Sequence, residues 1–153
     1  MPDQLTALTR IQIERACERL IHVYSRALDL GDMHAAADCF AINGSFARPM
    51  APDQLIVGRE AIRASLLTRP VTLLTRHLST NVMVDVEGPV SATALSYLTM
   101  VSTTPAEGAS PPHVAQGPIW FGEMRDRFVL EDNAWKFLER RGSIQMKHMN
   151  PPA

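Results

Sequence analysis

The stretch LTRHLSTNVMVDVEG, residues 74–88, places His77 and, four positions later, Asn81 inside a segment that otherwise reads as a buried strand. Its second half alternates with the period of two that is typical of β-structure. Apolar side chains fall on both faces: Val82, Val84 and Val86 on one, and Met83, between Asn81 and Asp85, on the other. A strand that is apolar on both faces predicts that its outer face packs against another subunit, so we expect a homo-oligomer.

The segments before this strand favour helices. From Thr9 onwards apolar residues recur at helical spacing, and Thr9 with Gln12 matches a capping box. We therefore expect a helix that begins at Thr9 and is stopped by Gly31. Two shorter helices are expected after it, one over 33–40 with Asp32 as its cap and one over 58–67.

The segments after Pro70 favour strands. The dipeptide Asn43–Gly44 predicts an earlier turn that leads into a short strand over 45–50. Residues 105–118 are rich in Pro, Gly and Ser and predict a loop. The long β-rich segments are separated by turns at 87–89 and 131–133, and the expected strands are 73–86, 91–103, 120–130 and 135–145.

Helices followed by strands predict an α+β fold. Three helices would pack on one face of a strongly curved, mixed or antiparallel sheet that encloses a pocket. A chain of 153 residues can bury one core without disulfides or metals, and no repeat or linker divides it. We therefore expect a single domain over residues 1–153.

Composition argues against several classes of partner. The chain has 15 Lys and Arg against 16 Asp and Glu, with no basic run of the kind that nucleic acids select. It has no apolar stretch long enough for a membrane helix or a secretory signal, so a cytoplasmic protein is expected. Cys17 and Cys39 lack metal spacing and are interpreted as small buried apolar residues. The histidines show no HxxxH or HExxH spacing, and there is no phosphate-binding loop, so neither a metal nor a cofactor is expected.

Four segments, in this order and spacing, resemble the SnoaL-like branch of the NTF2-like superfamily: YSRALDLGDMHAAADCF, GREAI, RHLSTNVMVDVEG and AWKFLERR. The resemblance covers roughly residues 10–145, and this branch includes scytalone dehydratases and hexachlorocyclohexane dehydrochlorinases. It implies a cone-shaped α+β fold around a small-molecule pocket, and assembly as a dimer or a trimer.

The resemblance also implies a catalytic pair. In similar dehydratases an aspartate near the end of the first helix pairs with a histidine that removes a proton from the substrate, and the matching positions here are Asp29 and His77. Helix electrostatics favours this pairing, because an aspartate in a last helical turn faces the negative end of the macrodipole and an imidazolium would offset that cost. The alternatives are that Asp29 is solvated, since it lies off the apolar stripe of its helix, and that His77 is a structural histidine.

The expected substrate-binding residues are Tyr24, Phe46, Arg48, Asn81, Trp120 and Met124. Asn81 would donate a hydrogen bond to a substrate oxygen, or it would only satisfy backbone hydrogen bonds at a strand end. Arg48 would bind an anionic or phenolic group, or it would lie on the surface of an edge strand. The others would form apolar walls or pack in the core. Scytalone itself is a doubtful substrate, because Leu28 and Arg48 stand where scytalone dehydratases carry tyrosines.

These observations favour a cofactor-independent lyase or isomerase that acts on a small hydrophobic substrate. His77 would take a proton from carbon and Asp29 would orient it. Two alternatives stay open. One is a non-catalytic ligand-binding or structural subunit that resembles the small subunits of ring-hydroxylating dioxygenases, and the other is a polyketide cyclase on the same scaffold.

Overall fold

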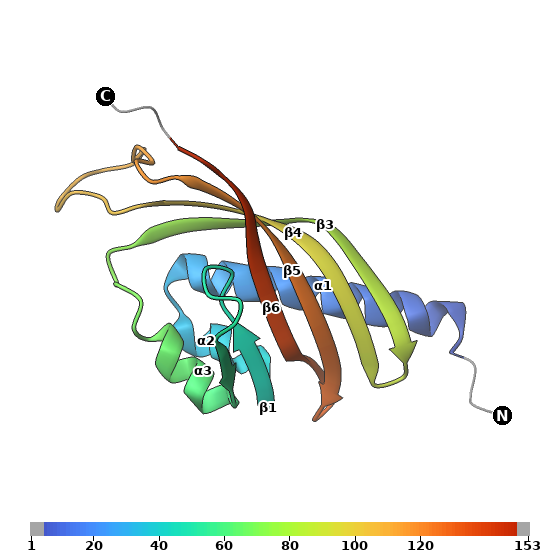
Figure 1. The fold of residues 1–153 in the computed structure, drawn as a ribbon. Coiled ribbons are helices and arrows are strands. Elements are labelled where there is room, and N and C mark those ends of the chain that lie inside the picture. Colours follow the sequence, from blue (N-terminus) through green and yellow to red (C-terminus); the bar gives the residue numbers. More distant parts are fainter. Residues whose placement is uncertain (1–4, 150–153) are drawn as a thin grey trace.

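Helices gather in the first half of the chain and long strands in the second (Figure 1). The computed structural model describes residues 5–149. Its helices are α1 (Ala7–Leu30), α2 (Met33–Asp38) and α3 (Arg59–Leu66). Its strands are β1 (Phe40–Ala47), β2 (Leu55–Val57), β3 (Leu74–Gly88), β4 (Ser91–Thr103), β5 (Ile119–Glu131) and β6 (Ala134–His148).

The six strands form one mixed sheet in the order β2-β1-β6-β5-β4-β3. Strand β1 runs parallel to β6, and all other neighbours are antiparallel. The sheet curls around α1, while α2 and α3 lie at one end beside β1 (Figure 1). The predicted α+β fold, with three helices on a strongly curved sheet, is confirmed. None of the described helices combines the length and apolar character needed to cross a membrane.

Helix α1 begins at Ala7, two residues earlier than the sequence predicted. Thr6, and not Thr9, is the N-cap, and its side chain accepts a hydrogen bond of 3.1 Å from the backbone N–H of Thr9. Thr9 resembles an N-cap in sequence, but in the structure it already lies inside the first turn of the helix. Gly31 ends the helix as predicted, in the left-handed conformation with φ of 76°. Asp32 caps α2, also as predicted.

The turn predicted at Asn43–Gly44 is wrong. Both residues lie inside β1, where the pairing with β6 shifts register between Phe40 and Ser45. A Cβ at Gly44 would stand 2.9 Å from the carbonyl oxygen of Phe137, so glycine is required here by close approach to the neighbouring strand. The dipeptide therefore marks an irregularity in a strand, and the short strand β2 was missed.

The core lies between α1 and the inner face of the sheet. Tyr24 on α1 meets Phe40, Phe46 and Phe137 edge-on or tilted, with ring centroids 5.7 to 6.3 Å apart. Both cysteines are free and buried, as interpreted from the sequence. Burial raises the pKa of the Cys17 thiol to about 12, which keeps it neutral and inert.

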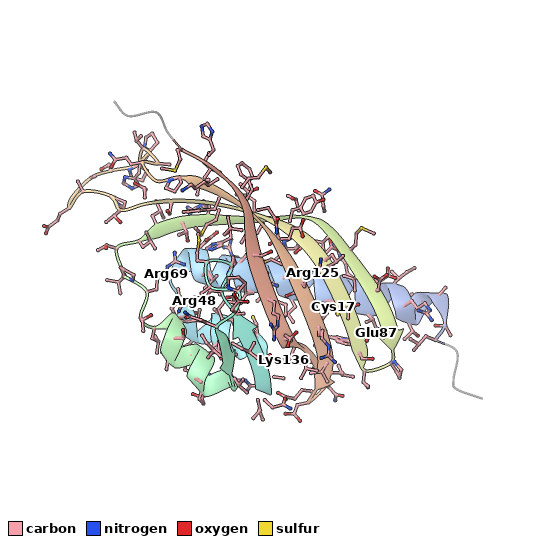
Figure 2. All side chains as sticks on the ribbon, viewed as in Figure 1. Cys17, Arg48, Arg69, Glu87, Arg125 and Lys136 are labelled. Atoms are coloured by element: carbon pink, nitrogen blue, oxygen red, sulfur yellow. The ribbon has the colours of Figure 1, made fainter. Side chains whose placement is uncertain are left out.

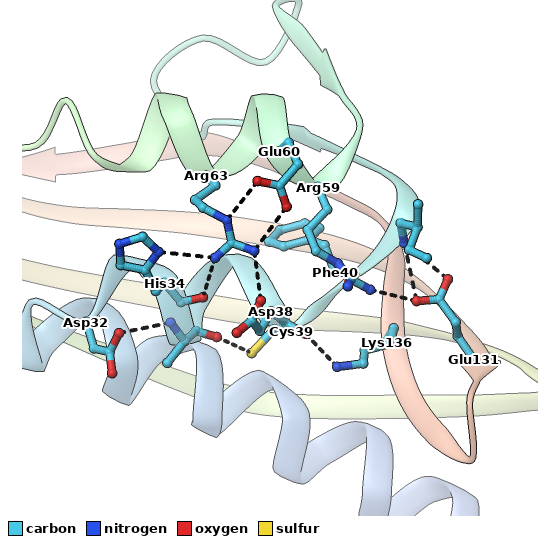
Figure 3. A network of polar contacts seen from close by, with 12 residues as sticks. Asp32, His34, Asp38, Cys39, Phe40, Arg59, Glu60, Arg63, Glu131 and Lys136 are labelled. Carbon is cyan, nitrogen blue, oxygen red and sulfur yellow. Dashed lines mark hydrogen bonds and ion pairs between the residues drawn. The ribbon is translucent and has the colours of Figure 1, made fainter.

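A polar network joins α2 and α3 to the sheet (Figure 3). Arg63 on α3 donates to Glu60 and, at 2.8 Å, to Asp38 of α2. Arg59 pairs with Glu131 at 2.6 Å and so connects α3 to the β5–β6 turn. Because these ion pairs link separate elements, they hold α3 in place over one end of the curled sheet.

Candidate active site

A cavity with a volume of about 400 Å³ lies between α1, α3 and the inner face of the sheet. This is within the size range of small-molecule sites. Most of the lining is apolar, with a few polar and charged side chains. Of the residues singled out in the sequence, the following line it: Tyr24, Phe46, Arg48, His77, Trp120 and Met124.

The structure brings Asp29 and His77 together. Asp29 Oδ1 and His77 Nδ1 are 2.6 Å apart, and Asp29 Oδ2 accepts a second hydrogen bond of 2.9 Å from the backbone N–H of His77. Thr75 Oγ1 donates to Asp29 Oδ1 at 2.9 Å. Three donors therefore converge on one carboxylate, which fixes both its position and the plane of the imidazole.

The two members of this pair have different exposure to the cavity. His77 lines it, whereas Asp29 does not and lies behind the ring. Both side chains are well enclosed, with 11% of His77 and 14% of Asp29 exposed. Nδ1 is engaged by Asp29, and Nε2 has no hydrogen-bond partner among residues 5–149. A carboxylate on one ring nitrogen leaves the other available to exchange a proton with a molecule in the cavity.

The environment of Asp29 keeps it ionised. Burial raises the pKa of the carboxyl, but hydrogen bonds from the His77 ring and backbone, the charge of His77 and the Thr75 hydroxyl outweigh burial and lower it below its ordinary value. Asp29 therefore remains an anion at neutral pH. An anion behind His77 stabilises the positive charge that the ring acquires when it accepts a proton.

A second group of polar residues adjoins the pair, and the sequence analysis missed it. Arg69, in the loop between α3 and β3, donates through Nη2 to Thr75 Oγ1 and to the carbonyl oxygen of Leu73. Arg69 and Thr75 both line the cavity. Thr75 thereby links the Arg69 guanidinium to Asp29. Thr75 precedes His77 by two in a strand, which puts both on one face, but no sequence signal pointed to the loop arginine.

A third charged group, also missed, lies deeper. Arg140 lines the cavity, is almost fully buried and pairs with Asp126 at 2.6 Å. Its guanidinium lies over the rings of Tyr24 and Phe137. Burial raises the pKa of Asp126 to about 6, against the opposing effect of Arg140. Three atoms here have no hydrogen-bond partner among the described residues: Ser96 Oγ, Asp126 Oδ1 and Arg140 Nε.

A β-bulge explains why Arg140 escaped sequence analysis. Arg127 pairs with Glu139 but Phe128 pairs with Phe137, so Leu138 is an extra residue in β6. Strict alternation from Phe137 would have put Arg140 on the outer face. The extra residue reverses the alternation and turns Arg140 inwards.

The structure does not bring Asn81 to the cavity, which corrects its assignment as a substrate-binding residue. In a regular strand, residues four apart share a face, so Asn81 would have joined His77. Instead β3 bulges between Thr80 and Met83, and Asn81 is exposed with φ of 51°. The bulge also places Val82, Val84 and Val86 on the core side, while Met83 faces out.

Arg48 lies on the cavity wall and is not a surface residue of an edge strand. It follows β1, and its Nη2 donates to the carbonyl oxygen and to the hydroxyl of Ser65 on α3. Among residues 5–149, no three His, Cys, Asp or Glu side chains gather closely enough to hold a metal ion. The polar groups in and next to the cavity are a histidine with its carboxylate, guanidinium groups and several hydroxyls.

The fold and this site define an NTF2-like protein, with a histidine–carboxylate pair set in a largely apolar cavity. The model of the SnoaL-like domain family matches residues 9–141, and the chain belongs to this family. No functionally curated protein matches the chain.

Several solved structures share the fold. A proposed scytalone dehydratase from Novosphingobium aromaticivorans is 22% identical, with a TM-score of 0.78 over 97% of this chain and 94% of that one. A hexachlorocyclohexane dehydrochlorinase (LinA, type 2) is 15% identical, with a TM-score of 0.76 over 96% of this chain and 99% of that one. A proposed aromatic ring hydroxylase from Novosphingobium aromaticivorans is 20% identical, with a TM-score of 0.70 over 89% and 91%. At these identities the likeness establishes the fold.

Proposed function

We propose that the protein is a cofactor-independent lyase or isomerase of the scytalone-dehydratase-like type, acting on a small, largely hydrophobic molecule. One observation carries the proposal: the 2.6 Å contact between Asp29 and His77, with His77 on the wall of a cavity of about 400 Å³ and Nε2 unpartnered among the described residues. The proposed dehydratase and the dehydrochlorinase among the structural neighbours support this reaction class, because both names describe lyase-type reactions on the same fold.

In the proposed reaction, His77 Nε2 takes a proton from a carbon of the substrate. The electron pair left on that carbon either forms a double bond as a neighbouring group departs, which is a lyase step, or is protonated at another carbon, which is an isomerase step. The imidazolium returns the proton to the departing hydroxyl or to the second carbon, so the protein is regenerated without a cofactor. Cavity guanidinium groups stabilise the negative charge that develops on the substrate.

The role proposed for Asp29 is to position His77. Its carboxylate keeps a proton on Nδ1, which leaves Nε2 as the base, and it stabilises the imidazolium. Only the neutral ring can accept a proton, so turnover should rise with pH through a single ionisation. Turnover that does not change with pH would contradict a histidine base.

The test begins with a thermal-shift screen of aromatic and polyketide-like compounds, followed by product analysis for each compound that binds. On an authenticated substrate, His77→Ala should lower turnover by about a hundredfold to ten-thousandfold and leave affinity largely intact, because the apolar walls supply most of the binding. Asp29→Asn should also lower turnover, since it removes the charge and can hold the wrong tautomer. His22→Ala, at an exposed position on α1, is the matched control.

If His77→Ala retains near wild-type turnover, His77 is a structural residue. The non-catalytic ligand-binding role would then be the better account of the cavity. A polyketide cyclase would use the same base, and the products of the reaction distinguish it from a lyase.

A further inference from the structure

The positive charge of the cavity exceeds the negative charge around it. Arg48, Arg69 and Arg140 line the cavity, and the two acidic groups bonded to its lining are Asp29 and Asp126. Asp126 forms an ion pair with Arg140. Asp29 is bonded directly to His77 and is linked through the Thr75 hydroxyl to Arg69. One guanidinium charge therefore has no carboxylate to balance it when the His77 ring is neutral.

The unbalanced charge lies on the side of the cavity formed by Arg48 and Arg69. Both arginines are half-buried, and neither forms an ion pair with a described residue. Burial lowers the pKa of the Arg69 guanidinium, and the nearby Asp29 offsets this only in part. A half-buried cation without an ion-pair partner favours the binding of an anion from outside the chain.

Both arginines keep free donors. Their hydrogen bonds to the protein use Nη2 alone: Arg48 donates to Ser65, and Arg69 donates to Leu73 and Thr75. Within residues 5–149, Nε and Nη1 of both side chains have no hydrogen-bond partner, and neither atom is sealed from the cavity or the solvent. The Nε–H and Nη1–H groups lie on different edges of a guanidinium, and each can donate one charge-assisted hydrogen bond to an oxygen of a bound carboxylate.

The two arginines come from different elements but face one space. Arg48 follows β1 and is held by Ser65 on α3, while Arg69 belongs to the loop after α3. Both lie between α3 and the curled sheet (Figure 2). Arg69 is also joined through Thr75 to the carboxylate that holds His77. An anionic group bound here would therefore be anchored on the same side of the cavity as the proposed base.

We propose that Arg48 and Arg69 form a carboxylate-binding subsite, and that the natural ligand is a mostly apolar ring compound bearing one carboxylate. The inference rests on the proposed function, because it takes the cavity as the substrate site, and it specifies the substrate class. The apolar walls bind the body of the ligand and the two guanidinium groups bind its anionic end, which fixes the orientation of the ligand relative to His77.

The test compares two probes that differ mainly in charge, 2-naphthoate and 2-naphthamide, by titration calorimetry at neutral pH. The wild type should bind the naphthoate about tenfold more tightly than the naphthamide, or better, because charge-assisted hydrogen bonds to a carboxylate are the stronger ones. Arg69→Gln and Arg48→Gln should each reduce this preference, and the double variant should abolish it while still binding the naphthamide. Arg125→Gln, an equal loss of charge at an exposed position on β5, should keep it (Figure 2).

Three outcomes would overturn the subsite: a wild type that binds neither probe, equal affinity for the two, or a preference that survives in the double variant. If Arg69→Gln weakens both probes equally and lowers the melting temperature, Arg69 merely ties the loop to β3, which also overturns it. Binding is measured without turnover, so the two proposals fail separately. A carboxylate preference without any His77-dependent reaction refutes the enzyme, and His77-dependent turnover of a neutral substrate without that preference refutes the subsite.

Discussion

At the scale of single residues, Asp29 is the group on which the site depends. It lies in the last turn of α1, where the carbonyl ends of the helix repel a negative charge. The His77 ring, the His77 backbone N–H and the Thr75 hydroxyl compensate for this with three hydrogen bonds. The contacts that stabilise the Asp29 carboxylate also orient the His77 imidazole. The stability of the fold and the proposed chemistry therefore depend on the same hydrogen bonds.

Asp29→Asn should lower the free energy of unfolding by about 1 to 2 kcal/mol at neutral pH, because hydrogen bonds to a charged acceptor are lost. The folded pKa of Asp29 lies below its ordinary value of 3.8, so the unfolded chain binds the proton more tightly. The contribution is therefore complete above about pH 5 and is lost as the pH falls through the folded pKa. Urea unfolding should show the difference between wild type and variant shrinking as the pH falls below 3.8. A constant difference would refute this coupling, and the exposed Asp53→Asn should have little effect throughout.

At the scale of elements, irregularities in the strands decide which side chains reach the cavity. The bulge at Asn81 in β3 and the extra residue Leu138 in β6 each reverse the alternation of their strand. The first keeps His77 and the later valines on one face, and the second turns Arg140 inwards. The register shift between β1 and β6 spans Gly44, where the backbones of the two strands approach closely.

Gly44→Ala should destabilise the fold by about 1 to 3 kcal/mol, because the added methyl group would stand 2.9 Å from a backbone carbonyl of β6 that cannot move aside. Gly88→Ala is the matched control, since its Cβ would meet only Ser91 Oγ at 3.5 Å. Thermal unfolding of the two variants checks the expectation. Equal melting temperatures would show that β1 can shift away from β6 without cost.

At the scale of the whole molecule, the outer face of the sheet carries a group of exposed apolar side chains. The side chains concerned are Leu78, Met83, Leu95, Tyr97 and Met146, between 49% and 68% exposed. Strand pairing sets Met83 beside Leu95, and Thr80 beside Tyr97. A surface of this kind is typical of an interface between subunits, which continues to favour the homo-oligomer expected from the sequence.

Light scattering after size exclusion should therefore give the mass of a dimer or a trimer at micromolar concentration. The double variant Leu95→Glu with Tyr97→Glu should dissociate it, because charges buried in an interface are costly. Ile11→Glu, an equally exposed apolar position on α1 and so away from this face, should not. A monomeric wild type would refute the prediction.

The sequence by itself determined the three helices, the four long strands after Pro70 and their order. Local periodicity and turn chemistry depend on neighbouring residues, so the helix stop at Gly31, the cap at Asp32 and the extent of β4 could be predicted from them. The contact between Asp29 and His77, 48 positions apart, was expected from family resemblance, with support from helix electrostatics. Periodicity does not encode such contacts.

Tertiary structure alone decided the rest of the site. A bulge depends on the pairing of two strands and cannot be read from either one, which is why Asn81 was misplaced and Arg140 missed. Arg69 entered the site because the loop after α3 folds back onto β3, a path that its own residues do not specify. The cavity is lined by residues from segments that are distant in the sequence. Its excess of positive charge therefore arises only when the folded chain brings these segments together.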